Sequence, residues 1–135
     1  MYEDMLENKI REAIRGQAAA IRYYSRLIRM LHNKRDQEQV EKYILNDEKR
    51  HIMEFREILR TLTGEDYNPE AEVKVPRHLD QAISQAINDE LEAAELYKGI
   101  AIQSGEAGVK YTFASAMQDE MEHATRLTYL YAKNK

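Results

Sequence analysis

Two short segments of the chain carry the same three chemically active residue types at the same spacing. In "LNDEKRHIMEF" (45–55) and "MQDEMEHATRL" (117–127), an Asp directly precedes a Glu, and a His follows three residues after that Glu. The residues are Asp47, Glu48 and His51 in the first segment and Asp119, Glu120 and His123 in the second. On a helix this spacing puts Glu and His on one face, one turn apart. Carboxylate and imidazole together suit iron, manganese or zinc, so the repeated motif indicates a metal site.

Four segments with helical spacing of their apolar residues must position these side chains. The predicted helices cover about 4–32, 36–63, 79–103 and 107–133. The composition agrees with helix formation, because 33% of the residues are charged, 43% are hydrophobic, and there are only five glycines and two prolines. Asp36, followed by Gln39, is the predicted N-terminal cap of the second helix, and Gly64 is its predicted C-terminal cap.

The connections between these helices predict the architecture. The first and second helices, and the third and fourth, are joined by a few residues and should be antiparallel. Residues 64–78 contain both prolines and form a longer connection. About 15 extended residues span about 50 Å, more than the length of a helix of about 40 Å. We therefore expect a single all-α domain, residues 1–135, in which two antiparallel hairpins are joined by a long crossover, as in ferritin-like four-helix bundles.

Each apolar stripe is interrupted near its centre by polar residues that would meet at one level of the bundle. The interrupting residues are Gln17, Glu48, His51, Glu90, Glu120 and His123. Three carboxylates in an apolar core are costly unless something compensates their charge, and divalent metal ions would do so. A single Glu-x-x-His pair is more often a solvated surface pair, but the duplication and the central positions favour ligands. Two interpretations of Gln17 are open: its amide could hydrogen-bond across the core, or its oxygen could be a weak metal ligand.

The two halves of the chain also resemble each other outside the motifs. "AIRGQAAAIRYY" (13–24) aligns with "AINDELEAAELY" (86–97), which pairs Gln17 with Glu90 and Tyr24 with Tyr97. Each half thus consists of a helix with one candidate ligand followed by a Glu-x-x-His helix. In this pattern the sequence, over essentially its whole length, resembles the ferritin-like superfamily, specifically di-iron carboxylate proteins of the rubrerythrin and bacterioferritin type.

The resemblance implies a set of roles for the polar residues. Glu48 and Glu120 would bridge two metal ions, His51 and His123 would bind one ion each, and Glu90 would be a terminal ligand. Further residues would support these ligands: Asp47 and Asp119 would orient the histidines, and Tyr24 and Tyr97 would hydrogen-bond the carboxylates. The ions would be iron first, with manganese or zinc as alternatives.

The sequence departs from the family pattern at three points. Gln17 stands where the family has a glutamate in its first helix, and Glu12 lies off the stripe. Ala93 stands where rubrerythrins carry a further glutamate, the one associated with redox-linked ligand exchange. The chain has no cysteine and hence no rubredoxin-like module, so electrons would come from a separate protein. Because only three glutamates remain, the metal position beside His51 should bind more weakly than the position formed with Glu90 and His123.

The predicted function is that of an oxidoreductase acting on peroxide or dioxygen in the rubrerythrin manner. The alternative is a non-enzymatic iron or metal-binding protein, or a helical interaction module with a degenerate metal site. The net charge of −4 with interspersed signs excludes a nucleic-acid binder, and no apolar run is long enough for a membrane span. We expect a soluble, cytoplasmic homodimer. A storage shell is disfavoured, because ferritin cages use a longer chain with a fifth helix.

Overall fold

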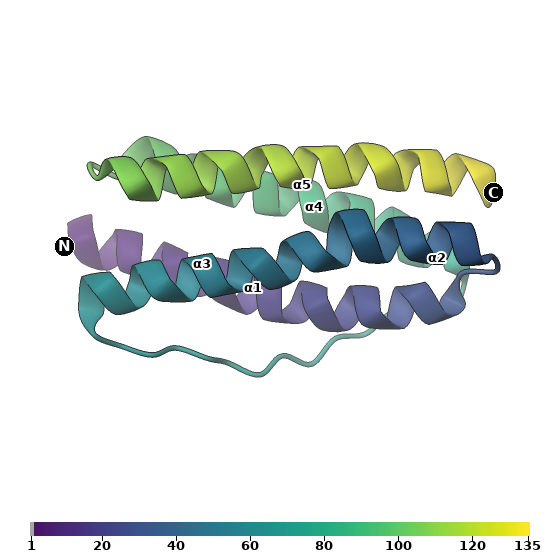
Figure 1. The fold of residues 1–135 in the computed structure, drawn as a ribbon, viewed down its shortest axis with the longest axis horizontal. Coiled ribbons are helices and arrows are strands. Elements are labelled where there is room, and N and C mark those ends of the chain that lie inside the picture. The colour runs from purple at the N-terminus through teal and green to yellow at the C-terminus, as the bar shows by residue number, and fades with distance from the viewer. Residues whose placement is uncertain (1) are drawn as a thin grey trace.

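The computed structural model of the protein describes the backbone of residues 2–135 and the side chains of residues 4–135. All the elements in this range are helical (Figure 1). They are α1 (Tyr2–Met30), α2 (Lys34–Val40), η1 (Glu41–Leu45), α3 (Asn46–Thr63), α4 (Leu79–Gln103) and α5 (Ala107–Lys133). The predicted all-α class is confirmed, and α4 and α5 begin and end where the sequence predicted.

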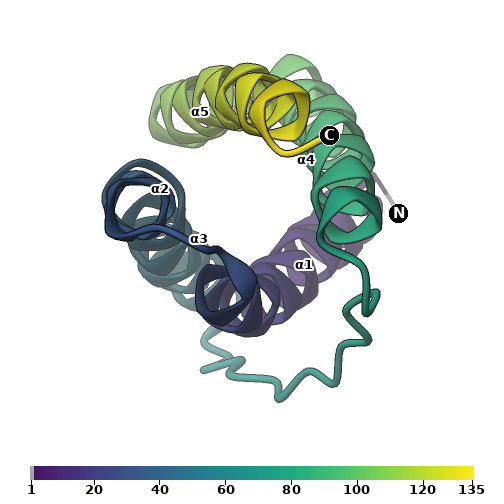
Figure 2. The ribbon, with the colours of Figure 1, turned by 90° about the vertical axis from the view of Figure 1, so that its right-hand side faces the viewer.

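The helices form a four-helix bundle in which α2, η1 and α3 together make up one of the four rods. This rod runs antiparallel to α1, and α5 runs antiparallel to α4 (Figures 1 and 2). α1 packs against both α3 and α4, and α4 packs along α5. Within residues 2–135, no helix is both long enough and apolar enough to cross a lipid bilayer.

The second rod contains a π-helical turn that the sequence analysis did not predict. Glu41–Leu45 forms this wide turn between α2 and α3, so the predicted single helix over 36–63 is α-helical only on either side of it. The turn ends three residues before Glu48 and buries Ile44 and Leu45. A π turn inserts extra backbone into a helix, and such turns often lie next to functional sites.

The predicted capping box at Asp36 and Gln39 is wrong by one turn. The N-terminal cap of α2 is Asn33, whose Oδ1 accepts from the backbone N–H of Asp36 at 2.8 Å. Asn33 Nδ2 in turn donates to Asp36 Oδ2 at 2.9 Å, and Lys133 Nζ donates to Asp36 Oδ1 at 2.8 Å. Asn33 is therefore the capping residue, and Asp36 is the residue that it contacts. The burial of the Asp36 carboxylate depends on its contact with Lys133 of α5.

Gly64 ends α3 as predicted and adopts a left-handed backbone conformation with φ of 79°. We expect Gly64→Ala to destabilise the protein by about 1 kcal/mol, because a Cβ disfavours this conformation. Urea denaturation followed by circular dichroism measures the difference. Gly105→Ala is the matched control, since Gly105 has no positive φ and open space around it. An equal effect of the two substitutions would contradict this role for Gly64.

The crossover over residues 64–78 runs back along the outside of the bundle, as predicted, and lies over α1 (Figures 1 and 2). Three arginines of α1 donate hydrogen bonds to it. The bonds run from Arg11 to Glu65 at 3.0 Å, from Arg15 to the Tyr67 hydroxyl at 3.1 Å, and from Arg26 to the Val73 carbonyl at 2.8 Å. An extended segment without secondary structure is thus held in place by contacts distributed along its length.

The core consists of two apolar clusters, one toward each end of the bundle. One contains Ile10, Ile14, Phe55, Tyr97 and Phe113, and the other contains Leu27, Ile44, Ile83, Leu127 and Leu130. On every helix the polar residues identified from the sequence lie between the two clusters. The helical spacing of apolar residues also assigns Leu62 to the apolar stripe of the second helix, but this side chain is 45% exposed near the end of α3.

Candidate metal centre

The polar layer between the two clusters brings together all six predicted residues. Each of them is at most 2% exposed: Gln17, Glu48, His51, Glu90, Glu120 and His123. Every rod of the bundle contributes at least one. Burial of this many ionisable groups in one layer carries a large desolvation cost, which is rarely met without a compensating charge.

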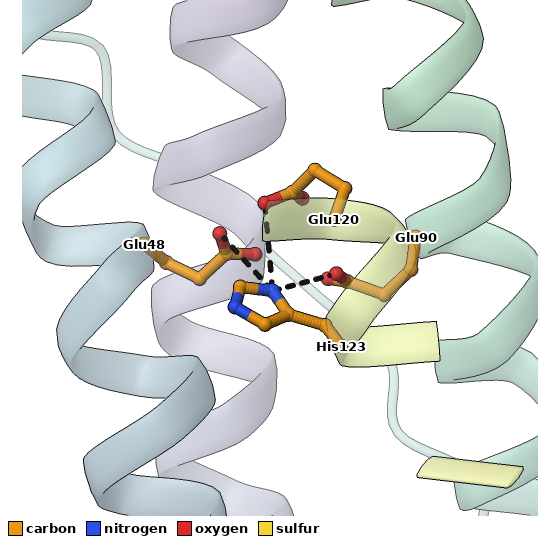
Figure 3. Close-up of side chains that lie close together, drawn as sticks. All are labelled: Glu48, Glu90, Glu120 and His123. Carbon is orange, nitrogen blue, oxygen red and sulfur yellow. Dashed lines mark hydrogen bonds and ion pairs between the residues drawn. The ribbon is translucent and has the colours of Figure 1, made fainter. Parts of the chain in front are cut away.

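Four of these side chains converge from three helices. Glu48 of α3, Glu90 of α4, and Glu120 and His123 of α5 point toward one another (Figure 3). Each offers one ligand atom, and these atoms all lie within 4.8 Å of one another. His123 Nδ1 lies 2.8 Å from Glu90 Oε2 and 3.5 Å from Glu120 Oε1. Three carboxylates and an imidazole at such distances form a donor set for a divalent ion.

His51 of α3 also lies close to Glu48 and Glu120. Its Nδ1 lies 3.2 Å from Glu48 Oε1 and 3.3 Å from Glu120 Oε1. Its ring is stacked on Phe55, with the centroids 5.8 Å apart and the planes 9° from parallel. Both histidines of the layer therefore turn Nδ1 toward the carboxylates, which leaves Nε2 free for a second contact.

That second contact is made by the aspartates, each of which reaches across to the opposite motif. His51 Nε2 lies 2.8 Å from Asp119 Oδ2, and His123 Nε2 lies 2.7 Å from Asp47 Oδ2. The resemblance implied that Asp47 and Asp119 orient the histidines, but not that each aspartate contacts the histidine of the other motif. A carboxylate on Nε2 fixes the ring and makes Nδ1 a better ligand.

Arg50 joins the two aspartates and was not identified from the sequence. Its guanidinium donates to Asp47 Oδ1 at 3.0 Å and to Asp119 Oδ2 at 2.8 Å. The i, i+3 spacing from Asp47 was the only available signal, and such pairs are common on exposed helices. The guanidinium therefore links the supports of both histidines on the α3–α5 side of the layer.

The two tyrosines of the duplicated segment have different partners. The Tyr24 hydroxyl donates to Glu90 Oε1 at 2.9 Å, as the resemblance implied. Tyr97 instead pairs with the amide of Gln17. In the amide orientation that satisfies both ends, Gln17 accepts from Tyr97 and donates to the carbonyl and Oε1 of Glu48, both at 3.2 Å. This arrangement favours the hydrogen-bonding role of Gln17 over ligation, because its oxygen already has a donor.

The pKa values of the ionisable groups in the layer are shifted far from their ordinary values. Burial, and then the charge of Glu120, raises the pKa of Glu48 to about 7. Burial, and then the charge of Glu48, raises the pKa of Glu90 to about 8. Burial alone would lower the histidine pKa values, but the carboxylates outweigh it and raise the pKa of His51 to about 11 and that of His123 to about 10. Without a metal ion, the layer therefore retains protons to balance its charge.

Two carboxylate oxygens remain without a hydrogen-bond partner inside the layer. These atoms are Glu48 Oε2 and Glu120 Oε1, both fully enclosed. The two histidine Nδ1 atoms near Glu120 Oε1, at 3.3 Å and 3.5 Å, make ion-pair contacts with it but no hydrogen bond. A buried acceptor without a donor is rare in folded proteins and calls for an unassigned ligand or water. Both belong to the residues predicted to bridge, so the donor set fits a pair of divalent ions.

We expect metal affinity to rise with pH. A metal ion must displace protons from Glu48 and Glu90, whose raised pKa values leave them partly protonated near neutrality, and from both histidines. Each displaced proton should contribute roughly a tenfold gain in affinity per pH unit. Calorimetric titration with Co²⁺ between about pH 6 and pH 8, in buffers of different ionisation enthalpy, measures the affinity and the protons released. A pH-independent affinity would contradict displacement of protons from this layer.

The bundle aligns with a crystal structure of ferritin-like, diiron-carboxylate proteins from Bacillus anthracis (strain Ames). The alignment has a TM-score of 0.82 at 18% sequence identity and covers 97% of this chain and 98% of that chain. The fold is therefore that of a ferritin-like four-helix bundle.

The sequence profile of the rubrerythrin family matches residues 8–131. The chain belongs to the rubrerythrin family. It is also similar to the uncharacterized protein YhjR of Bacillus subtilis (strain 168), with 28% identity over 127 residues, which are 94% of this chain and 87% of that protein.

Proposed function

We propose that this chain is a dinuclear iron oxidoreductase that reduces peroxide or dioxygen with electrons from a separate protein. The observation that carries the proposal is the buried layer of three glutamates and two histidines, in which each Nδ1 faces carboxylates and each Nε2 is held by an aspartate. An exposed or relic cluster would need neither the burial nor the aspartates. Membership of the rubrerythrin family and the fold shared with diiron-carboxylate proteins support the same conclusion.

The residues would form two metal positions, with Glu48 and Glu120 common to both. Glu90 and His123 would hold one ion together with Glu48 and Glu120, which is the group whose ligand atoms lie within 4.8 Å of one another. His51 would hold the other ion with the same two glutamates. Mixed oxygen and nitrogen donors suit iron, and manganese or zinc would fit the same set.

Two bound iron ions would supply reversible one-electron redox chemistry and Lewis acidity next to each other. The chain supplies the surroundings. The two apolar clusters keep bulk water from reaching the layer along the axis of the bundle. This exclusion of water strengthens the charge interactions inside the layer. Tyr24 holds one oxygen of Glu90, and the aspartates hold the imidazole rings. The ligands are thus fixed before any ion arrives, which limits the reorganisation that the reaction requires.

The 135 residues contain no cysteine to hold an iron–sulfur centre, so we infer that a separate redox protein donates the electrons. A homodimer stays our prediction for the assembly.

One observation favours a second candidate function, that of a non-enzymatic metal-binding protein. The oxygen of Gln17 accepts from Tyr97 and adds no charge to the layer. The three glutamates supply −3 against the +4 of two divalent ions. A protein with one tight position and one weak position suits metal handling as well as catalysis.

Peroxide consumption by iron-loaded protein separates the two functions. The apoprotein is reconstituted anaerobically with Fe²⁺, desalted and analysed for iron, and then mixed with hydrogen peroxide and an excess of a chemical reductant. Two bound irons with repeated turnover would support the oxidoreductase. Bound iron without turnover would support metal handling, and protein that retains no iron would contradict both.

A further inference from the structure

A cavity opens on one side of the metal layer, between α1 and α4. It has a volume of about 450 Å³ and reaches Glu48, Glu90 and Glu120 from the protein surface. Val73 and Lys74 of the crossover lie at its outer part, where Arg26 holds the Val73 carbonyl. Two of its lining residues, Glu48 and Glu120, carry the buried oxygens that have no hydrogen-bond partner. The cavity therefore leads from the protein surface to three glutamates of the proposed metal centre.

Small residues keep this side of the layer open. Ala13, Gly16, Ala20 and Ala93 line the cavity, and a Cβ added at Gly16 would meet no heavy atom within 4 Å. Ala93 occupies the position where the resemblance led us to expect a glutamate, whose longer side chain would take up part of this space. On the α3–α5 side, by contrast, the histidines are backed by the aspartates and the guanidinium that joins them.

The outer part of the cavity is acidic. Glu12, Asp89 and Glu92 are exposed residues that line it, against the single cation of Lys74. A passage lined by one sign of charge between low-dielectric walls raises the local concentration of ions of the opposite sign and their rate of association. The acidic outer part and the three glutamates at the inner end both favour a cation over an anion.

We propose that the cavity between α1 and α4 is the route by which divalent metal ions reach the buried ligands. The inference rests on the proposed function only in requiring that the layer binds metal. It assigns to Gly16 and Ala93 the role of keeping the route wide, and to the acidic residues the role of attracting ions. None of these residues need be a ligand, so changes to them should alter the rate of metal uptake and leave the stoichiometry unchanged.

The test is the rate of Co²⁺ uptake by the apoprotein, followed by stopped-flow absorption of the bound ion. Gly16→Leu should slow uptake by at least roughly tenfold, because the new side chain fills space that the ion must cross. Gly99→Leu is the matched control, since Gly99 is also a helical glycine with open space around it but does not line the cavity. Equilibrium Co²⁺ content should equal that of the wild type in both variants.

The charge of the outer part is tested separately, with variants that do not depend on tolerance of Gly16→Leu. Glu12→Gln combined with Glu92→Gln should slow uptake by roughly threefold to tenfold and weaken its dependence on salt, whereas Lys74→Gln should accelerate it. Wild-type rates in folded Gly16→Leu and in the charge variants, at unchanged Co²⁺ content, would overturn the route and leave the metal centre standing. Absence of Co²⁺ binding by the wild-type protein would instead overturn the proposed function.

Discussion

Glu120→Ala should abolish high-affinity metal binding, whereas Glu122→Ala, two residues further along the same helix, should leave it unchanged. Glu120 is 1% exposed and lies within reach of both histidine Nδ1 atoms, at 3.3 Å from His51 and 3.5 Å from His123. It therefore belongs to both proposed metal positions, and its loss should weaken both. Glu122 is exposed and pairs with Arg126 at 3.0 Å. We expect the affinity for Fe²⁺ or Co²⁺ to fall by at least about a hundredfold for the first variant.

The comparison requires that both variants fold. Circular dichroism and thermal melting of the metal-free proteins establish this before metal content is measured by mass spectrometry. His123→Ala provides an independent variant at the same centre and should retain the weaker position at most. Similar metal loss from Glu120→Ala and Glu122→Ala would show that the buried face of α5 does not carry the ligands.

Gln17→Glu should tighten the weaker metal position and move the stoichiometry toward two ions. The substitution adds a fourth carboxylate to the layer, so that −4 balances the +4 of two divalent ions. It also replaces an amide that donates to Glu48 Oε1 at 3.2 Å with a group of like charge. In the metal-free protein the new carboxylate should therefore lower the melting temperature, because like charges in a buried site repel. Added metal should reverse this loss and raise the melting temperature beyond the gain seen in the wild type.

The matched control is Gln17→Met, which keeps the approximate volume of the side chain and removes the amide. It should not tighten either position, since it adds no charge. Titration with Co²⁺ at limiting concentrations resolves the two positions as successive binding steps. Equal affinity of both positions in the wild type, unaffected by Gln17→Glu, would contradict the asymmetry and leave Gln17 with a purely structural role.

The helices and the polar layer between them could be predicted from the sequence, because the spacing of apolar residues along each helix is periodic. An apolar repeat interrupted once per helix, near the midpoint, predicts a polar layer wherever helices of similar length pack side by side. The long connection over 64–78, with both prolines, indicates a crossover rather than a short loop. These are properties of single helices and their order, and the structure agrees with both.

Contacts between side chains of different helices could not be predicted in this way. They depend on how the helices pack against each other, and the sequence of one helix does not determine that packing. Asp47 contacts the histidine of α5, and Asp119 contacts that of α3, only because the two helices run side by side at the level of the layer. Arg50 acts on both aspartates for the same reason. The cap at Asn33 was missed because Asp36 and Asn33 are both good capping residues, and the contact with Lys133 decides between them.

The π turn at Glu41–Leu45 has no glycine or proline to mark it. It changes the helical register just before the first motif, and it retains Ile44 and Glu48 on the buried side. A change of register of this kind is determined by packing against the other helices, so it becomes visible only in the folded chain.

Anomalous diffraction from crystals soaked with Fe²⁺ or Mn²⁺ tests the central claim most directly. We expect two peaks inside the polar layer, one beside Glu90 and His123 and one beside His51, with Glu48 and Glu120 between them. The peak beside His51 should be the weaker at limiting metal. Absence of any peak within the layer, or metal bound only at the protein surface, would contradict the assignment of this layer as a dinuclear metal centre.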